Sequence, residues 1–205
     1  MSVRLWNKAR LTLLIVVLVV TGIPLQAVEA ADVNVALGKE VTASSSAEPL
    51  LSSPSSIVDG DLSTDWASDG SHTPPISTTD PQWLLVDLGS QFTISQWVMY
   101  CYYDSSSDDN RCKDATLEGS NDGTSFTSID SVDDSTQDPD TEQPWLLKLD
   151  RSLGTPATYQ YFRVSITEVG QDSGNFINIY EFELYGVPAS SEVDAETPSI
   201  GTQPA

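Results

Sequence analysis

The stretch IVDGDLSTDW, residues 57–66, concentrates oxygen-bearing side chains that could hold a cation or take part in hydrolysis. These side chains belong to Asp59, Asp61, Ser63, Thr64 and Asp65. An EF-hand loop beginning at Asp59 would need Gly at its sixth position and Glu at its twelfth, but Thr64 and Gly70 stand there. A catalytic carboxylate pair needs two acids held across a cleft in different environments, whereas Asp59 and Asp61 share one tight glycine turn. The residues alone therefore argue against an EF-hand and against a catalytic pair, and an acidic turn without a metal ion remains.

The elements that must position this stretch are strands, since helical periodicity is hard to find in the sequence. Segments rich in β-branched and aromatic residues cover 82–89, 92–103, 114–120, 125–132, 144–150, 159–169 and 176–186. Clusters of Gly, Asn, Asp and Ser separate several of them. Strands at this spacing predict an all-β sandwich or barrel.

The N-terminus has the pattern of a secretory signal peptide. Basic residues precede an apolar run, and residues 28–30 have the small-x-small form of a cleavage site. An uncleaved membrane anchor is the alternative, but Gly22, Pro24 and Gln26 interrupt the apolar span that it would need. We therefore predict a signal peptide over residues 1–30 and a secreted, extracellular protein.

The remaining chain divides into a folded domain and a tail. Residues 188–205 lack aromatic residues and are rich in Pro, Ser, Thr and acidic residues, so they cannot bury a core. We predict that residues 31–187 form one domain and that residues 188–205 form a flexible acidic tail. The domain is long enough for a two-layer core.

The chain is strongly acidic, with 30 Asp and Glu residues against 9 Lys and Arg residues and a net charge of −21. Loss of residues 1–30 removes three basic residues and one acidic residue, which leaves a net charge of about −23. Such a surface repels nucleic acid and anionic lipid at long range and favours cations and neutral ligands. The composition therefore argues against a nucleic-acid partner and against an anionic membrane.

Cys101 and Cys112 are the only cysteines. An even number of cysteines in an exported protein favours a disulfide. A Cys-Cys metal site is the alternative, but no histidine or third cysteine lies near them in the sequence. A disulfide would pin the loop between the two residues and contribute about 2–3 kcal/mol.

Six blocks follow one another along the chain: NVALGKEVTASSS, SSIVDGDLSTDWAS, PQWLLVDLGSQFTISQWVM, ATLEGSNDGTSFTSI, YFRVSITEVG and INIYEFELYG. Their order and spacing resemble the coagulation factor 5/8 type C (discoidin) family, which overlaps with galactose-binding carbohydrate-binding modules and fucose-binding lectins. The resemblance covers approximately Val33 to Gly186. It implies a galactose-binding-domain-like jelly-roll β-sandwich of about eight antiparallel strands, with loops projecting from one end.

Similar domains hold a structural calcium ion in the acidic loop and close the site from the last strand. The resemblance implies side-chain oxygens from Asp59 and Thr64, main-chain carbonyls from Ser56 and Asp61, and a distant carboxylate from Glu181, with the Asp61 carboxylate as an additional candidate ligand. Such a set is chemically sensible because a calcium ion takes about six to eight oxygens, and carboxylates balance its charge. The ion would tie the loop to the strand rather than take part in catalysis.

The resemblance also places a sugar on the loops at one end of the sandwich. It points to His72 and Arg111 as residues that grip sugar hydroxyls. Tyr102 or Tyr103 could offer a stacking ring, with core packing at a strand end as the alternative, and the loop 170–176 supplies Asn175 and Phe176 as further candidate contacts. An exposed loop histidine, and an ion pair between Arg111 and neighbouring aspartates, are the structural alternatives. The stretch MYCYYDSSS lacks the second arginine of fucose-binding relatives, which argues against fucose specificity.

The sequence therefore predicts a secreted, calcium-stabilised, lectin-like module that binds galactose- or fucose-like glycans or glycoproteins reversibly. One shallow site would bind weakly, so a homo-oligomer would add avidity. A protein-binding cell-adhesion or matrix module on the same fold, without sugar binding, is the alternative. We predict no enzymatic activity, because a lone histidine among many serines does not make a catalytic triad. Trp66, Trp83 and Trp97 are predicted to pack in the core.

Overall fold

The computed structural model of the protein describes residues 32–47, 53–70, 76–103, 112–133, 138–139, 143–170 and 176–189. These residues form β1 (Val33–Asn34), β2 (Glu40–Ala43), a 3-10 helix η1 (Pro54–Val58), β3 (Trp66–Ala67), β4 (Gln82–Tyr102), β5 (Cys112–Ser120), β6 (Thr127–Val132), β7 (Asp138–Pro139), β8 (Leu146–Val169) and β9 (Asn178–Pro188). Within this described part, no helix is long and apolar enough to cross a membrane.

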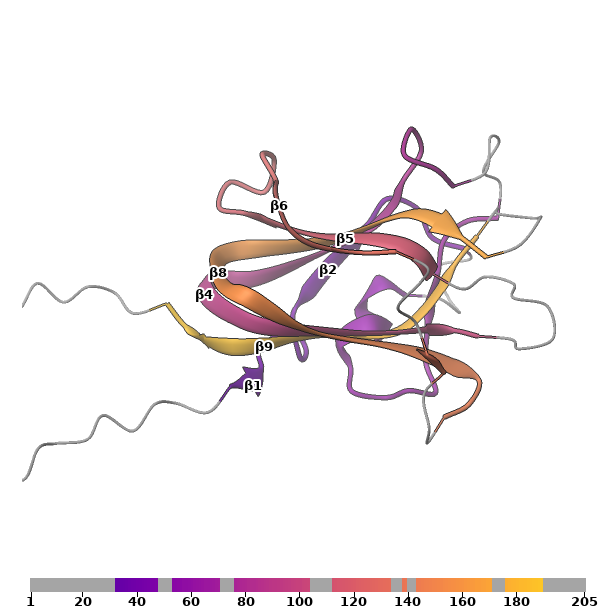
Figure 1. Cartoon of the computed structure of the whole chain (residues 1–205), viewed down its shortest axis with the longest axis horizontal. Helices are drawn as coiled ribbons and strands as arrows, with labels where there is room; N and C mark the ends of the chain where they lie inside the picture. The colour runs from indigo at the N-terminus through magenta and orange to yellow at the C-terminus, as the bar shows by residue number, and fades with distance from the viewer. Residues whose placement is uncertain are drawn as a thin grey trace, which may run out of the picture.

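The strands are antiparallel and hydrogen-bonded in the order β1-β9-β4-β8-β5-β6, while β2 joins β4, β3 joins β9 and β7 joins β8. Two layers arise because β4 and β8 each pass from one layer into the other (Figure 1). Residues 82–87 of β4 pair with residues 161–166 of β8, and β2, β5 and β6 extend this five-stranded layer. Residues 96–102 of β4 pair with residues 146–152 of β8 and with β9, which form the second layer, here called the β9 layer.

The passage between the layers corrects the predicted strand boundaries. The sequence predicts separate strands over 82–89 and 92–103, but the chain bends within one strand, and the pairing register shifts between Asp87 and Phe92. Gly89 lies in this bend with a φ of 81°, a conformation that favours glycine. The GSQ segment is therefore a bend, because both sides of it keep their hydrogen bonds to β8. The predicted strands 144–150 and 159–169 likewise form one strand, β8.

Alternating side chains fill the space between the layers. The largest fully buried side chains include Trp66, Trp97, Phe162 and Phe182, and Trp97 meets Phe182 edge to face at 6.3 Å between ring centroids. The predicted packing of Trp66 and Trp97 is confirmed. Trp83 is only half-buried, because its neighbours on β4 point inward and the alternation directs it to the outer face.

The predicted all-β sandwich is confirmed, and its boundary moves slightly. β9 continues to Pro188, one residue beyond the predicted end of the domain, because Val187 and Pro188 still pair with Thr93 and Phe92 of β4. Residues 1–31 and 190–205 lie outside the described residues. The predicted signal peptide and nearly all of the predicted tail therefore lie there too.

A carboxylate clasp joins the two layers at their open edge. Asp130 of β6, in the five-stranded layer, faces Trp97 and Arg151, which are paired neighbours in the β9 layer. Its Oδ2 accepts hydrogen bonds from Trp97 Nε1 and Arg151 Nε at 3.0 Å, and its Oδ1 accepts one from Arg151 Nη2 at 3.0 Å. Burial alone would raise the pKa of Asp130, but these donors outweigh it and hold the pKa below its ordinary value.

We expect Asp130→Asn to lower the free energy of unfolding near neutral pH by about 1.5–3 kcal/mol, because it removes a charge-assisted clasp. The pKa of Asp130 is lowered in the folded state, so the clasp is fully present above the unfolded pKa of about 3.9 and is lost as the pH falls through the folded value. The variant and the wild type should therefore converge in acid. Urea unfolding near neutral pH and near pH 3 measures both effects.

Glu168→Gln provides the control, because it removes the exposed Lys113–Glu168 ion pair of 2.7 Å and should change stability by less than about 1 kcal/mol. Equal stability of Asp130→Asn and wild type near neutral pH would show that the clasp does not hold the layers together.

Candidate ligand and metal sites

The connections that carry the predicted ligand residues leave the sandwich at one end. The strand ends meet there, since Gln82 pairs with Ile166, and Cys112 pairs with Val169. Ser68 N donates to Ile177 O at 3.0 Å and Ile177 N donates to Ser68 Oγ at 3.1 Å, which ties the β3–β4 connection to the β8–β9 connection. We call this end the loop end. The start of β1 and the end of β9 lie at the opposite end (Figure 1).

Of the predicted sugar contacts, His72, Arg111 and Asn175 lie outside the described residues. Tyr103 and Phe176 are described, and both are half-buried at the loop end. The backbone N–H of Tyr103 donates to the carbonyl of Trp145 at 2.9 Å. Phe176 precedes the buried Ile177.

Trp145 is an exposed aromatic residue at the loop end that the sequence analysis missed. Its side chain is 39% exposed, and its ring meets that of Tyr180 edge to face at 5.0 Å and 75°. Burial raises the pKa of Tyr180, and the nearby Asp65 and Tyr102 raise it further. Trp145 and Tyr180 thus form a small aromatic platform. The sequence signal for Trp145 is its position directly before two leucines at the start of a predicted strand.

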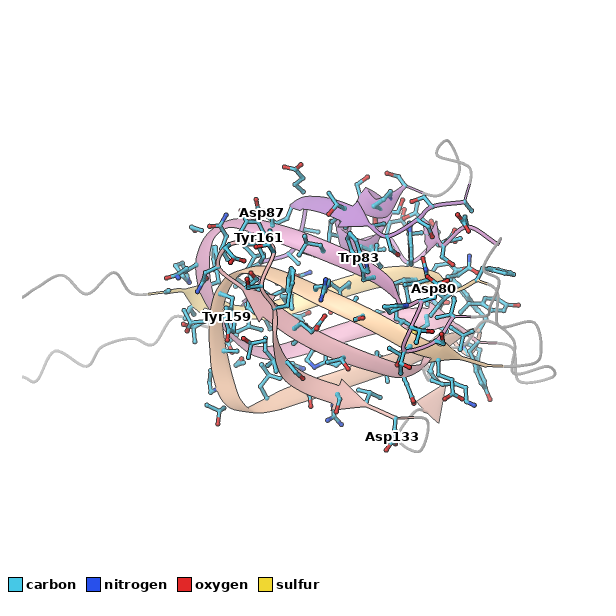
Figure 2. The ribbon with its side chains drawn as sticks, turned by 90° about the horizontal axis from the view of Figure 1, so that it is seen from above. Asp80, Trp83, Asp87, Asp133, Tyr159 and Tyr161 are labelled. Carbon is cyan, nitrogen blue, oxygen red and sulfur yellow. The ribbon has the colours of Figure 1, made fainter. Side chains whose placement is uncertain are left out.

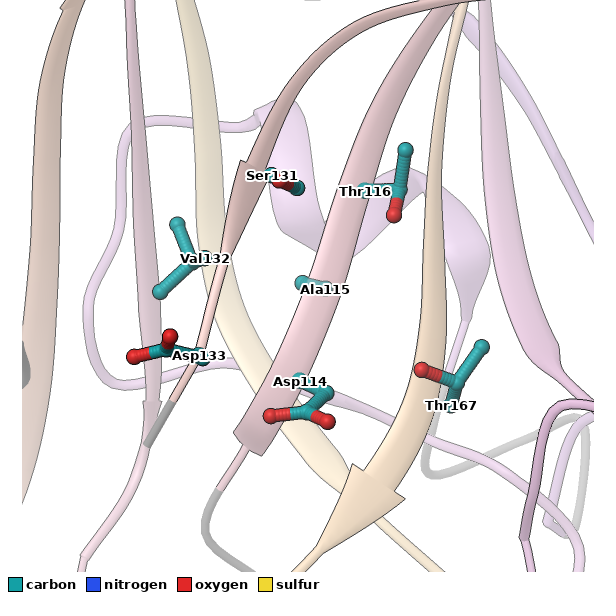
Figure 3. A pocket seen from close by; sticks show the side chains of 7 residues that line it. All are labelled: Asp114, Ala115, Thr116, Ser131, Val132, Asp133 and Thr167. Carbon is teal, nitrogen blue, oxygen red and sulfur yellow. The ribbon is translucent and has the colours of Figure 1, made fainter. Parts of the chain in front are cut away.

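A polar pocket opens at the loop end of the five-stranded layer (Figure 3). Its volume is about 270 Å³, and its lining consists of Asp114, Ala115, Thr116, Ser131, Val132, Asp133 and Thr167. In the close-up Asp114 lies on β5, Asp133 directly follows β6, and Thr167 lies on β8. Such a set accepts hydrogen bonds from hydroxyl or ammonium groups. It depends on the pairing of β5, β6 and β8, so no short sequence motif reveals it.

The acidic loop follows η1 and folds around its own side chains. Asp59 Oδ1 accepts from Asp61 N at 2.8 Å, and Asp59 Oδ2 accepts from Thr64 Oγ1 at 2.8 Å. The hydroxyl of Thr64 also reaches the carbonyl of Asp61 at 3.0 Å, while hydrogen bonds from Ser63 lower the pKa of the Asp61 carboxyl. The structure thus brings three predicted metal ligands together. Ser56 lies in the preceding η1, where its N–H donates to Ser53 O at 2.9 Å.

Glu181 reaches this loop from β9 and is 2% exposed. Its Oε2 accepts from Gly60 N at 3.1 Å, whereas its buried Oε1 has no hydrogen-bond partner within the described structure. Burial raises the pKa of Glu181 to about 8; the carboxylates of Asp59, Glu183 and Asp61 act in the same direction, and the Gly60 N–H opposes them. A buried acid beside other acids needs either a proton or a cation.

The donor set therefore suits a hard cation, although carboxylates alone do not complete it. Across the described ranges, no three His, Cys, Asp or Glu side chains converge closely enough to hold a metal ion. A calcium ion here would draw the rest of its oxygens from main-chain carbonyls and the Thr64 hydroxyl, as the resemblance implies.

Cys101 and Cys112 are both buried, and each carries a thiol in this structure rather than half of a disulfide. Cys101 lies in the β9 layer and Cys112 in the five-stranded layer, and both belong to the core between the layers. The predicted disulfide is thus not formed here. Its formation in an oxidising compartment stays a prediction.

Comparison with known proteins identifies the family. The model of the F5/8 type C domain matches residues 40–182, which is more than half of the 205-residue chain. The chain belongs to this family, as the sequence blocks indicated. No curated protein matches it.

Solved structures show the same fold. Chitosan-binding module 1 of a chitosanase/glucanase from Paenibacillus sp. IK-5 is 28% identical, with a TM-score of 0.54 over 75% of this chain and 99% of that one. The family 32 carbohydrate-binding module of Clostridium perfringens NanJ, in complex with galactose, is 18% identical, with a TM-score of 0.53 over 76% and 98%. A fucolectin from striped bass (Morone saxatilis) is 13% identical, with a TM-score of 0.60 over 80% and 52%.

We predict that the two cysteines pair when the chain is exported into an oxidising medium, because they face the same core from opposite layers. The intact mass of the secreted protein should then be lower by two hydrogens than that of the reduced protein. Alkylation of both thiols in denatured but unreduced protein would contradict the pairing.

Proposed function

We propose that this chain is an exported, non-catalytic module that binds glycans reversibly at the loop end. The observation that carries the proposal is the platform of Trp145 and Tyr180, since an exposed flat ring held by a second ring offers a surface for the C–H face of a sugar. The fold supports it, because the neighbouring structures include carbohydrate-binding modules and a fucolectin.

Amino-sugar glycans are the ligand class that the charge favours. The chain carries a net charge of −21, and Asp114 and Asp133 line the polar pocket together with three hydroxyl groups. A protonated amine donates hydrogen bonds and gains Coulomb energy beside carboxylates. The 28% identical module from Paenibacillus binds chitosan by its description, which supports the same class. Galactose-like sugars are the second ligand class to compare in binding experiments, because the structure of the NanJ module contains galactose.

We also propose that calcium stabilises the module. Asp59, Thr64 and Glu181 would contribute side-chain oxygens, and Asp61 and Ser56 main-chain carbonyls. The ion would supply the positive charge that the buried Glu181 carboxylate lacks. The support for this proposal is the unpartnered Glu181 Oε1 next to the Asp59 loop. The ion would hold the loop on β9 and would play no part in ligand chemistry.

We expect Trp145→Ala to weaken glycan binding about tenfold while leaving the fold intact, because the ring contributes stacking but little to the core. A glycan array and calorimetry with glucosamine oligomers and galactosides, in millimolar calcium, measure this. Val33→Ala is the control, since Val33 is also exposed but lies in β1, near the chain ends. A blank array from folded protein would overturn glycan binding and favour a protein-binding adhesion module.

Calcium should raise the melting temperature, and a concentration one hundred times the dissociation constant should add about 2.7 kcal/mol of stability. Glu181→Gln and Asp59→Asn should each abolish this gain, whereas Glu168→Gln, which changes an exposed acid on β8, should retain it. Thermal melts in calcium and in chelator measure the difference. A calcium response that survives in both loop variants would contradict the site.

A further inference from the structure

The outer face of the five-stranded layer carries aromatic and acidic side chains. Alternation along β4 buries Leu84 and Val86, so Trp83, Leu85 and Asp87 point outward. Figure 2 shows Trp83 part of the way along this layer, with Asp87 and Tyr161 side by side near the end opposite the loop end. Asp87 and Tyr161 are paired neighbours on β4 and β8.

A second pocket lies at this position. Its volume is about 160 Å³, and it is lined by Glu40, Thr42, Leu85, Asp87 and Tyr161. These residues come from three neighbouring strands, because β2 pairs with β4 and β4 pairs with β8. Asp87 is four residues beyond Trp83, which corresponds to about 13 Å along an extended strand.

Of the two carboxylates of this pocket, Asp87 is held in place by hydrogen bonds, and neither is paired with a described Lys or Arg. Asp87 Oδ1 accepts from Gly89 N at 2.7 Å and from Gln160 Nε2 at 3.0 Å, which orients the side chain. Glu40 is exposed, and no described Lys or Arg forms an ion pair with either acid.

Arg163, the paired neighbour of Leu85, is engaged elsewhere. Its Nε donates to Glu118 Oε2 at 2.7 Å, and its guanidinium lies 3.8 Å from the centre of the Phe126 ring. It is therefore not available to balance the charge of the pocket.

We propose that this pocket binds an amino-sugar residue with a protonated amine, as a second subsite of the proposed glycan-binding function. The Tyr161 ring and Leu85 would pack against the apolar face of the sugar, and Glu40 and Asp87 would accept hydrogen bonds from its ammonium group. The lining offers only two hydroxyl donors but two carboxylates, so the ligand must supply most of the donors and the positive charge. That requirement selects an amino sugar over a neutral one.

A second subsite also changes how affinity depends on ligand length. Once an oligomer is bound at the loop end, a sufficiently long one can also bind this pocket of the same protein molecule. The second binding step is then intramolecular, so the affinity of the oligomer exceeds the affinity of either site alone. Short amino sugars should occupy the two sites independently.

The test is an NMR titration of isotope-labelled full-domain protein with a glucosamine oligomer and with its fully N-acetylated counterpart. We expect the amides of Glu40, Thr42, Leu85, Asp87 and Tyr161 to shift with the glucosamine oligomer only. The shifts should weaken with added salt, because part of the attraction is between exposed charges. The double change Glu40→Gln and Asp87→Asn should weaken binding at this pocket at least about tenfold.

Two further variants keep the result interpretable. Glu40→Lys places a positive charge at an exposed position that no core contact depends on, and it should block the pocket even if Asp87→Asn disturbs the bend. Asp150→Asn with Glu168→Gln removes two negative charges from exposed sites elsewhere on the module and should leave this pocket unchanged.

The outcomes separate this inference from the proposed function. Shifts confined to the loop end would overturn the second subsite while supporting glycan binding there. Shifts nowhere would overturn both. An equal loss in the double variant and in the charge-matched control would show general attraction between the acidic surface and a cation, and would also overturn the subsite.

Discussion

The architecture depends on two strands, β4 and β8, that pair with each other in both layers of the sandwich. Because each strand bends once, the chain crosses between the layers without a loop, and the core closes at that side. The same bend, at Gly89, leaves the other ends of both strands together at the loop end. The aromatic platform and the polar pocket lie at this end, and Asp130 joins the two layers through Trp97 and Arg151.

The sequence could predict those parts of the fold and the sites that a sequence pattern marks over many residues. Long alternating segments such as 159–169 predicted strands and core correctly, because every second residue reports on burial. The strands β1, β3 and β7 have two residues each and leave no period to detect. The resemblance placed Glu181 beside Asp59, which no local pattern links. The two pockets depend on the register of three strands, so neither has a local motif.

The acidic residues divide into two groups with different physical roles. Asp61 is exposed, and hydrogen bonds within its own turn stabilise its charge. Asp130 is partly buried, but arginine and tryptophan donors satisfy it. Glu181 differs, because it is buried and one of its oxygens is unsatisfied. A charge of that kind destabilises the fold unless a proton or a cation balances it.

The basic residues of the described part are engaged with partners of their own. Lys113, Lys148, Arg151 and Arg163 each form an ion pair with a carboxylate. Lys39 donates to the carbonyl of Leu88 at 3.1 Å. Among the described residues neither pocket is lined by Lys or Arg. Both pockets belong to the five-stranded layer, so the amino-sugar chain that we propose would meet both if it lay along this layer.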